Sequence, residues 1–120
     1  MKKLGYCVGS LLLLCSGAAL AQDVAQFGLK YLQVLAEDDK ARVLKYTPHK
    51  GDKTPMHSHP ATVVYVIRGG RVRSTFPDGS TKVTELKTGA ALIRPPVTHA
   101  DEALDDVEIV LVELKQRESR

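Results

Sequence analysis

The sequence predicts an all-β domain built as an antiparallel sandwich or barrel. Between residues 31 and 114, short runs rich in Val, Ile, Thr and Tyr alternate with turns that contain Gly, Pro or Asp. These β-branched and aromatic residues suit the pleated, half-buried surface of a strand. Beyond residue 21, no long stretch has the apolar period of a helix. Many short strands with frequent turn signals are typical of antiparallel double-sheet folds.

Each expected strand ends where the chain meets a residue that breaks β structure. The Gly69-Gly70 and Asp78-Gly79 steps predict hairpins, because glycine supplies the positive φ that tight turns need. Pro48 and the Pro95-Pro96 pair stand at strand ends, where a missing N–H does no harm. The expected strands cover residues 31–36, 41–47, 62–68, 71–76, 80–86, 90–94, 97–103 and 107–114.

Residues 1–21 have the layout of a cleaved secretory signal peptide. A basic Met1-Lys2-Lys3 head precedes an apolar run, and Ala19-Leu20-Ala21 places small residues just before Gln22. The alternative is a transmembrane anchor, but the run is diluted by Gly and Ser and is short of the ~20 apolar residues that a spanning helix needs. We therefore expect cleavage before Gln22 and a periplasmic or secreted protein.

Removal of this segment changes what the composition means. The full chain has 17 basic and 14 acidic residues. Lys2 and Lys3 are lost with the signal peptide, so the mature chain is close to neutral. A near-neutral chain argues against nucleic acid or an anionic membrane as a partner. Cys7 and Cys15, the two cysteines, also leave, which excludes disulfide scaffolding and thiol catalysis. The expected organisation is a signal peptide at 1–21, an N-terminal segment with the first strand at 22–40, a barrel at 41–114 and a tail at 115–120.

Three of the four histidines form a pattern that metal chemistry uses. His57-Ser58-His59 places two imidazoles at i and i+2, on one face of an extended chain and ~6.5–7 Å apart at the backbone. Two such rings can lean together and bind one ion at ~2.0–2.1 Å. His99 follows a proline pair at the start of another expected strand, which could lie beside the first and complete a three-nitrogen site. His49 is expected to be a loop residue outside this site.

The glycines and prolines around these histidines resemble the two motifs of the cupin family. Gly51, five further residues, His57-Ser58-His59 and a strand ending at Gly69-Gly70 resemble the first motif. The segment from Gly89 to His99, which contains Pro95-Pro96, resembles the second. The chain is therefore similar to small single-domain cupins of the type 2 conserved barrel family. The resemblance covers about residues 41–114. It implies a cupin-type antiparallel jelly-roll barrel in which His57, His59 and His99 hold one divalent metal ion.

The chain departs from the family pattern where an acidic ligand usually stands. The pattern has a glutamate after the second histidine, with three or four residues between, and here those positions are Val63 and Val64. Val97 also stands near the usual glycine of the second motif. A site of three neutral imidazoles favours Fe, Zn, Ni or Cu over Mn, which prefers oxygen ligands. Such a site still has open positions for a substrate or dioxygen.

Two residues are candidates for contact with a substrate. Arg94 ends a strand close to the proposed barrel mouth, where its guanidinium could bind a substrate carboxylate in a bidentate way. The alternative for Arg94 is an ion pair with Glu102 or Asp101. Tyr65 shares the strand parity of His57 and His59, so its hydroxyl could reach the pocket.

Two carboxylates close to His99 are candidates for supporting roles. Asp101 lies two residues after His99 and faces the same side of the strand, so we expect it to orient an imidazole N–H. Glu102 has an odd offset and points to the opposite face, where an exposed position is favoured over support of the metal ligands. We expect four further apolar or aromatic residues to pack inside the barrel: Met56, Tyr65, Ile67 and Phe76.

These observations leave two functions open. One is an exported metal-binding cupin that acts on a small molecule as a dioxygenase through a three-His centre. The other is a non-catalytic barrel that binds or senses a metal or a small ligand. A homodimer is also expected, because a small chain with several strand edges gains by burying one against a copy of itself. The apolar segment 107–112 could be that edge, or it could be a central strand.

Overall fold

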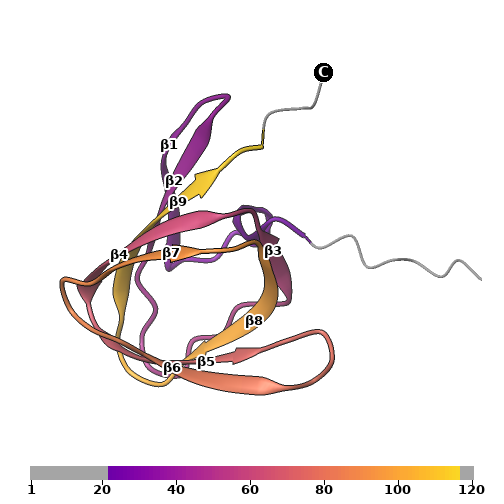
Figure 1. The fold of residues 1–120 in the computed structure, drawn as a ribbon. Coiled ribbons are helices and arrows are strands. Elements are labelled where there is room, and N and C mark those ends of the chain that lie inside the picture. Colours follow the sequence, from indigo (N-terminus) through magenta and orange to yellow (C-terminus); the bar gives the residue numbers. More distant parts are fainter. Residues whose placement is uncertain (1–21, 117–120) are drawn as a thin grey trace, which may run out of the picture.

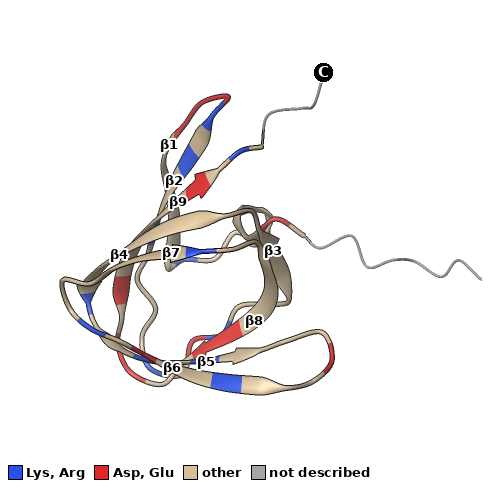
Figure 2. Cartoon of the chain, viewed as in Figure 1, with Lys and Arg blue, Asp and Glu red and all other residues tan. Residues whose placement is uncertain are grey.

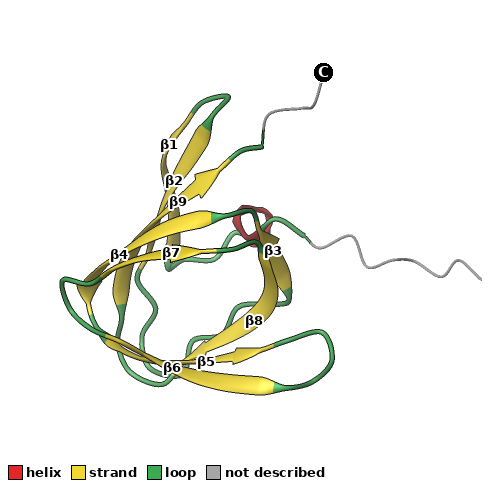
Figure 3. Ribbon diagram, viewed as in Figure 1, coloured by secondary structure: helices red, strands yellow, loops and turns green. Residues whose placement is uncertain are grey.

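The computed structural model of this protein describes residues 22–116, and these form two antiparallel sheets that face each other (Figure 1). The expected signal peptide at 1–21 and residues 117–120 of the expected tail lie outside the described residues. Within the described residues, strands make up almost all of the regular structure, beside a single helical turn, η1 (Figure 3). No helix in the described part of the chain is long and apolar enough to span a membrane. The elements in chain order are η1 (Val24–Phe27), β1 (Leu32–Glu37), β2 (Ala41–Tyr46), β3 (His57–His59), β4 (Thr62–Arg68), β5 (Gly70–Thr75), β6 (Thr81–Leu86), β7 (Ala91–Arg94), β8 (Val97–Ala103) and β9 (Glu108–Leu114).

The strand order shows how distant parts of the chain come together. One sheet has the order β1-β2-β9-β4-β7, and the other has the order β3-β8-β5-β6. The hairpin of β1 and β2 extends past the end of the barrel (Figure 1). The two strands that carry the motif histidines, β3 and β8, are hydrogen-bonded neighbours in the smaller sheet. The expected all-β, antiparallel jelly-roll architecture is confirmed.

The core lies between the sheets and follows the alternation of each strand. On β4, Val64 and Val66 are fully buried, while Tyr65 between them is half exposed. Ile109 and Leu111 of β9 and Leu44 of β2 point to the same core. Burying a side chain of this size contributes about 1.5–3 kcal/mol. This packing holds the sheets together without any disulfide among residues 22–116, where the sequence has no cysteine.

The Gly69-Gly70 step is not the hairpin that we expected. It carries the chain from β4 in the larger sheet to β5 in the smaller one, and neither glycine has a positive φ. Glycine is required there for space, since a Cβ on Gly69 would lie 2.8 Å from the backbone nitrogen of Thr88. The other expected turn is a true hairpin: Gly79, with φ of 84°, lies between the paired strands β5 and β6.

Several packing expectations were wrong because strand parity changes at a bend. β3 and β4 are separated by Pro60 and Ala61, and this break resets the alternation between inward and outward positions. Tyr65 and Ile67 therefore face outward, with 52% and 40% of their surface exposed. Met56 lies before this break and is also exposed, because it directly precedes the inward-facing His57. Phe76 is half buried and lines the cavity between the sheets.

The segment 107–112 is not a sheet edge. It belongs to β9, which pairs with β2 on one side and β4 on the other, so it is a central strand. The edges of the two sheets are β1 and β7 in the larger and β3 and β6 in the smaller. The homodimer stays a prediction, and any edge pairing would have to use one of these four strands.

Candidate metal centre

The three motif histidines come together because of the pairing between β3 and β8. His57 and His99 are direct partners across this antiparallel pair. Side chains of direct partners lie on the same face, and so do residues two apart on one strand. His57, His59 and His99 therefore all point from the smaller sheet into the space between the sheets. The register of the β3–β8 pair thus brings the three histidines together, as expected.

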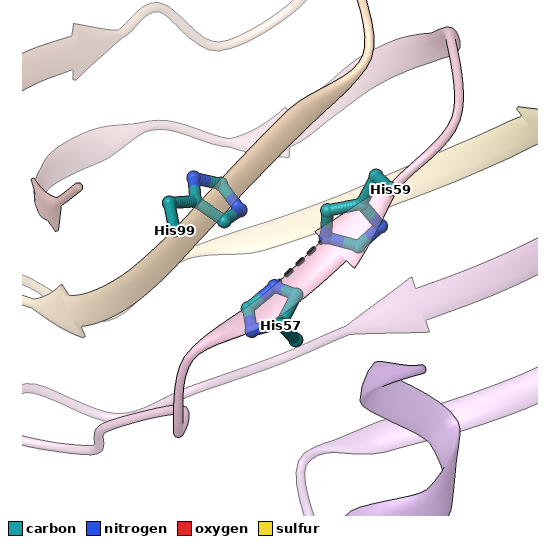
Figure 4. A group of neighbouring side chains, drawn as sticks. All are labelled: His57, His59 and His99. Atoms are coloured by element: carbon teal, nitrogen blue, oxygen red, sulfur yellow. Dashed lines mark hydrogen bonds between the residues drawn. The ribbon is translucent and has the colours of Figure 1, made fainter. Parts of the chain in front are cut away.

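The rings form a compact and buried group (Figure 4). The ring centres of His57 and His59 are 4.6 Å apart, and that of His99 lies 4.8 Å from His57 and 5.4 Å from His59. One nitrogen from each ring can serve as a ligand atom, and these three nitrogens all lie within 4.8 Å of one another. The exposed fractions of these residues are only 1%, 9% and 6%. An ion at this point would be bound away from bulk solvent.

Hydrogen bonds on the outer side of two rings determine which nitrogen faces the group. Nδ1 of His57 lies 2.7 Å from the carbonyl oxygen of Pro55, which can only accept, so Nδ1 carries the proton. Nδ1 of His59 lies 3.0 Å from Oε2 of Glu113, and an ionised carboxylate also only accepts. In the neutral rings, both Nε2 atoms are then unprotonated, yet they face each other at 2.9 Å. Two lone pairs at this distance repel unless a cation lies between or beside them.

His99 has a nitrogen that no group of residues 22–116 satisfies. Its Nε2 is buried and has no hydrogen-bond partner within the described residues, although Oδ2 of Asp101 lies 3.4 Å away. Burial lowers the pKa of His99 to about 4, against the opposing influence of the Asp101 carboxylate. Burial also lowers the pKa of His57. Neutral imidazoles are the form that binds metals. The three histidines therefore fit a metal site in number and arrangement, and burial favours the neutral, metal-binding form of His57 and His99.

Solved structures that resemble this one share its fold. No family model and no curated protein matches the chain by sequence. A cupin domain from Bordetella pertussis superposes with a TM-score of 0.64 at 22% identity, over 71% of this chain and 92% of that one. The described part of the present chain therefore has the cupin fold. A cupin superfamily protein from Desulfitobacterium hafniense (TM-score 0.56, 16% identity, 71% of this chain and 76% of that one) is similar as well. A cupin with a double-stranded β-helix fold from Methanocaldococcus jannaschii also superposes on this chain, with a TM-score of 0.54 at 14% identity, over 69% of this chain and 77% of that one.

A partly buried ionic network supports His59 in this barrel, and the sequence analysis did not find it. Oε1 of Glu113 accepts from Nε of Arg42 at 2.7 Å, and Arg42 donates two more bonds to Asp23, both at 2.6 Å. Burial by itself raises the pKa of Glu113, but the hydrogen bonds from His59 and Arg42 outweigh it and hold that pKa below its usual value. Glu113 is thus an ionised carboxylate that fixes the His59 ring. A sequence signal existed: Glu113 shares the inward parity of Ile109 and Leu111.

The other carboxylates occupy places that the strand parity explains. Asp101 lies beside His99, as expected, but approaches Nε2 without the geometry of a hydrogen bond, and its Oδ1 accepts from Ser74 at 2.6 Å. Asp101 thus makes no hydrogen bond that would orient the His99 ring, whereas the Pro55 carbonyl and Glu113 orient the rings of His57 and His59. Glu102 points to the other face, between Lys53 at 3.7 Å and Arg73 at 3.6 Å, and does not reach the histidines.

The remaining candidates divide between cavity and surface. Arg94 lines the cavity and makes no ion pair with Glu102, Asp101 or any other acidic group of residues 22–116, so the alternative of an ion pair was wrong. Tyr65 faces outward and is not a cavity residue. The His49 side chain is 85% exposed in a loop, as expected.

The cupin barrel contains a cavity of about 380 Å³ next to the histidines, which is at the small end of ligand pockets. Its walls are mostly apolar and include Phe76, Leu92, Val97 and Leu111. Tyr46 also lines it, and its hydroxyl is buried without a hydrogen-bond partner in the described structure. Tyr46 is a second residue that the sequence analysis missed.

Proposed function

We propose that this protein is an exported cupin of the type 2 family. In this proposal His57, His59 and His99 hold one divalent transition-metal ion, and the protein oxidises a small organic molecule with dioxygen. The observation that supports it most strongly is the distance of 2.9 Å between the Nε2 atoms of His57 and His59, whose lone pairs repel when both rings are neutral and carry their protons on Nδ1. A cation bound by both converts this repulsion into two favourable contacts. The unsatisfied Nε2 of His99 supplies a third ligand atom.

The residues of the chain prepare this site in three ways. Pro55 and Glu113 hold the outer nitrogens of His57 and His59, which keeps both rings in the ligand tautomer. Burial of the rings keeps the centre away from bulk solvent. The apolar cavity beside them provides space for an organic molecule. A transition-metal ion in such a site supplies a Lewis acid with open positions and, where the ion is iron, a redox partner for dioxygen.

The composition of the site favours particular metals. Three imidazoles without a carboxylate ligand suit Fe, Zn, Ni or Cu, whereas Mn and Mg prefer oxygen ligands. Asp101 is the single carboxylate among the described residues that line the cavity, and one of its oxygens already accepts a hydrogen bond from Ser74. This scarcity of groups for proton transfer favours a second candidate function, a non-catalytic barrel that binds or senses a metal or small ligand.

Oxygen uptake distinguishes the two candidates. We expect that protein reconstituted with Fe(II) under anaerobic conditions consumes dioxygen when it is mixed with some member of a panel of small aromatic and aliphatic molecules. His99→Ala should abolish this uptake because it removes a ligand. His49→Ala should leave it unchanged, since its side chain lies in an exposed loop. An oxygen electrode measures both rates. Iron-loaded protein that consumes no dioxygen with any member of the panel would support the binding barrel instead.

A further inference from the structure

Two cationic side chains line the cavity from opposite sheets. Arg94 ends β7 in the larger sheet, and Lys82 lies on β6 in the smaller sheet. Both are edge strands, so the two cations lie on the borders of the sheets that enclose the cavity. Figure 2 shows that basic residues occur on both β6 and β7.

Neither of these cations has an anionic partner in the described structure. Arg42, Arg71 and Arg73 each form an ion pair, with Asp23, Asp105 and Glu102 respectively. Arg94 and Lys82 form none with any acidic group of residues 22–116. Arg94 is also half buried, where a charge without a partner is costly. An anion placed next to it would offset that cost.

The cavity lining as a whole has a positive net charge. Among the described residues, its lining has two cations against a single carboxylate, Asp101. The cluster of three neutral imidazoles adds no negative charge, and a divalent ion bound there would add positive charge. A low-dielectric cavity concentrates such a field and attracts small anions. The cavity therefore favours an anionic ligand over a neutral or cationic one.

The shape and polarity of the walls define the rest of the ligand. Phe76, Leu92 and Val97 offer apolar contacts to a hydrocarbon body. Tyr46 also lines the cavity and is 7% exposed. A volume of about 380 Å³ suits a small molecule. The planar guanidinium of Arg94 matches a carboxylate or a phosphate in a bidentate way.

We infer that the cavity binds a small organic anion, a carboxylate on an aromatic or aliphatic body, and that Arg94, with help from Lys82, selects it by its charge. This inference rests on the proposed function, because it names the ligand class of the same cavity. Arg94 and Lys82 are the binding residues.

Calorimetry with matched acids and amides tests the inference. The titrants are benzoate, benzamide, hexanoate, hexanamide and phenyl phosphate, added to zinc-loaded and to metal-free protein. We expect both carboxylates to bind about tenfold or more tightly than their amides, since each amide lacks the charge that Arg94 recognises. Arg94→Gln should remove this preference without changing the affinity for the amides. Lys82→Gln should weaken carboxylate binding in the same direction but less, because Lys82 is exposed.

A matched control and a separate metal assay make the result decisive. Arg68→Gln removes an exposed arginine outside the cavity and should change nothing. Equal affinity for acids and amides, failure of both carboxylates to bind in the millimolar range, or an acid preference that survives Arg94→Gln would overturn the inference. Preference for phenyl phosphate over both carboxylates would overturn the carboxylate assignment. Metal content is measured on the same samples, so loss of the metal centre is seen separately from loss of anion selection.

Discussion

The double variant His57→Ala/His59→Ala is expected to lose its metal ion completely. Both rings point Nε2 at the same place, so their removal leaves His99 as a single imidazole that cannot hold the ion alone. Zinc at a hundred times its Kd should raise the free energy of unfolding of the native protein by about 2.7 kcal/mol. The same zinc addition should leave the double variant unchanged. Elemental analysis and thermal unfolding measure the two effects.

The control for this experiment is His49→Ala. His49 is the one remaining histidine of the chain, and it lies in an exposed loop outside the cluster. This variant should keep the metal and the full stabilisation by zinc. Circular dichroism shows whether the double variant still has its β structure. A folded double variant that retains the metal, or a His49 variant that loses it, would show that the ion is bound elsewhere.

The second large effect is expected from Glu113→Gln, which keeps the shape of the side chain and removes its charge. Arg42 only donates, so the amide oxygen must face Arg42 and the amide NH₂ must face His59. Nδ1 of His59 then has to accept, and the ring carries its proton on Nε2, the nitrogen that faces the other histidines. Metal affinity should fall about 10–100-fold. The free energy of unfolding should fall by about 1–3 kcal/mol because Arg42 loses a charged partner.

A carboxylate of the same strand provides the comparison. Glu108 of β9 pairs with Lys45 at 3.0 Å, but both side chains are about one third exposed (32% and 38%). Exposed pairs contribute only about 0–1 kcal/mol, so Glu108→Gln should leave metal affinity unchanged. Nitrogen NMR of His59 reports its tautomer directly. If Glu113→Gln left the His59 tautomer and the metal affinity as they are, Glu113 would not be a positioning residue.

The sequence alone was sufficient for the parts of the structure that depend on local patterns. Spacing at i and i+2 put His57 and His59 on one face, and the glycines and prolines of the two motifs predicted the fold around them. Asp78-Gly79 predicted a real hairpin for the same local reason. Parity along one strand also placed Asp101 beside His99 and Glu102 away from it.

Errors arose where the outcome depends on contacts between distant segments. Tyr65 was assigned by counting from His59, but the bend at Pro60 and Ala61 reverses that count. Gly69 looked like a turn glycine and is instead a position where the backbone of Thr88 leaves no space for a side chain.

The support for His59 depends on long-range register in the same way. Glu113 reaches the ring because β9 pairs with both β2 and β4, with Arg42 and Thr62 as its direct neighbours. No pattern near His59 in the sequence contains this information. An acidic residue at an inward position of an apolar strand was the one available hint.

X-ray absorption spectroscopy of the zinc-loaded protein tests the metal centre most directly, because it counts and identifies the atoms bound to the ion. We predict a first shell that contains three imidazole nitrogens at ~2.0–2.1 Å, with the remaining position taken by water or another small oxygen ligand. A shell with one or two imidazoles, or one dominated by carboxylate oxygens, would contradict the assignment of His57, His59 and His99 as the three ligands.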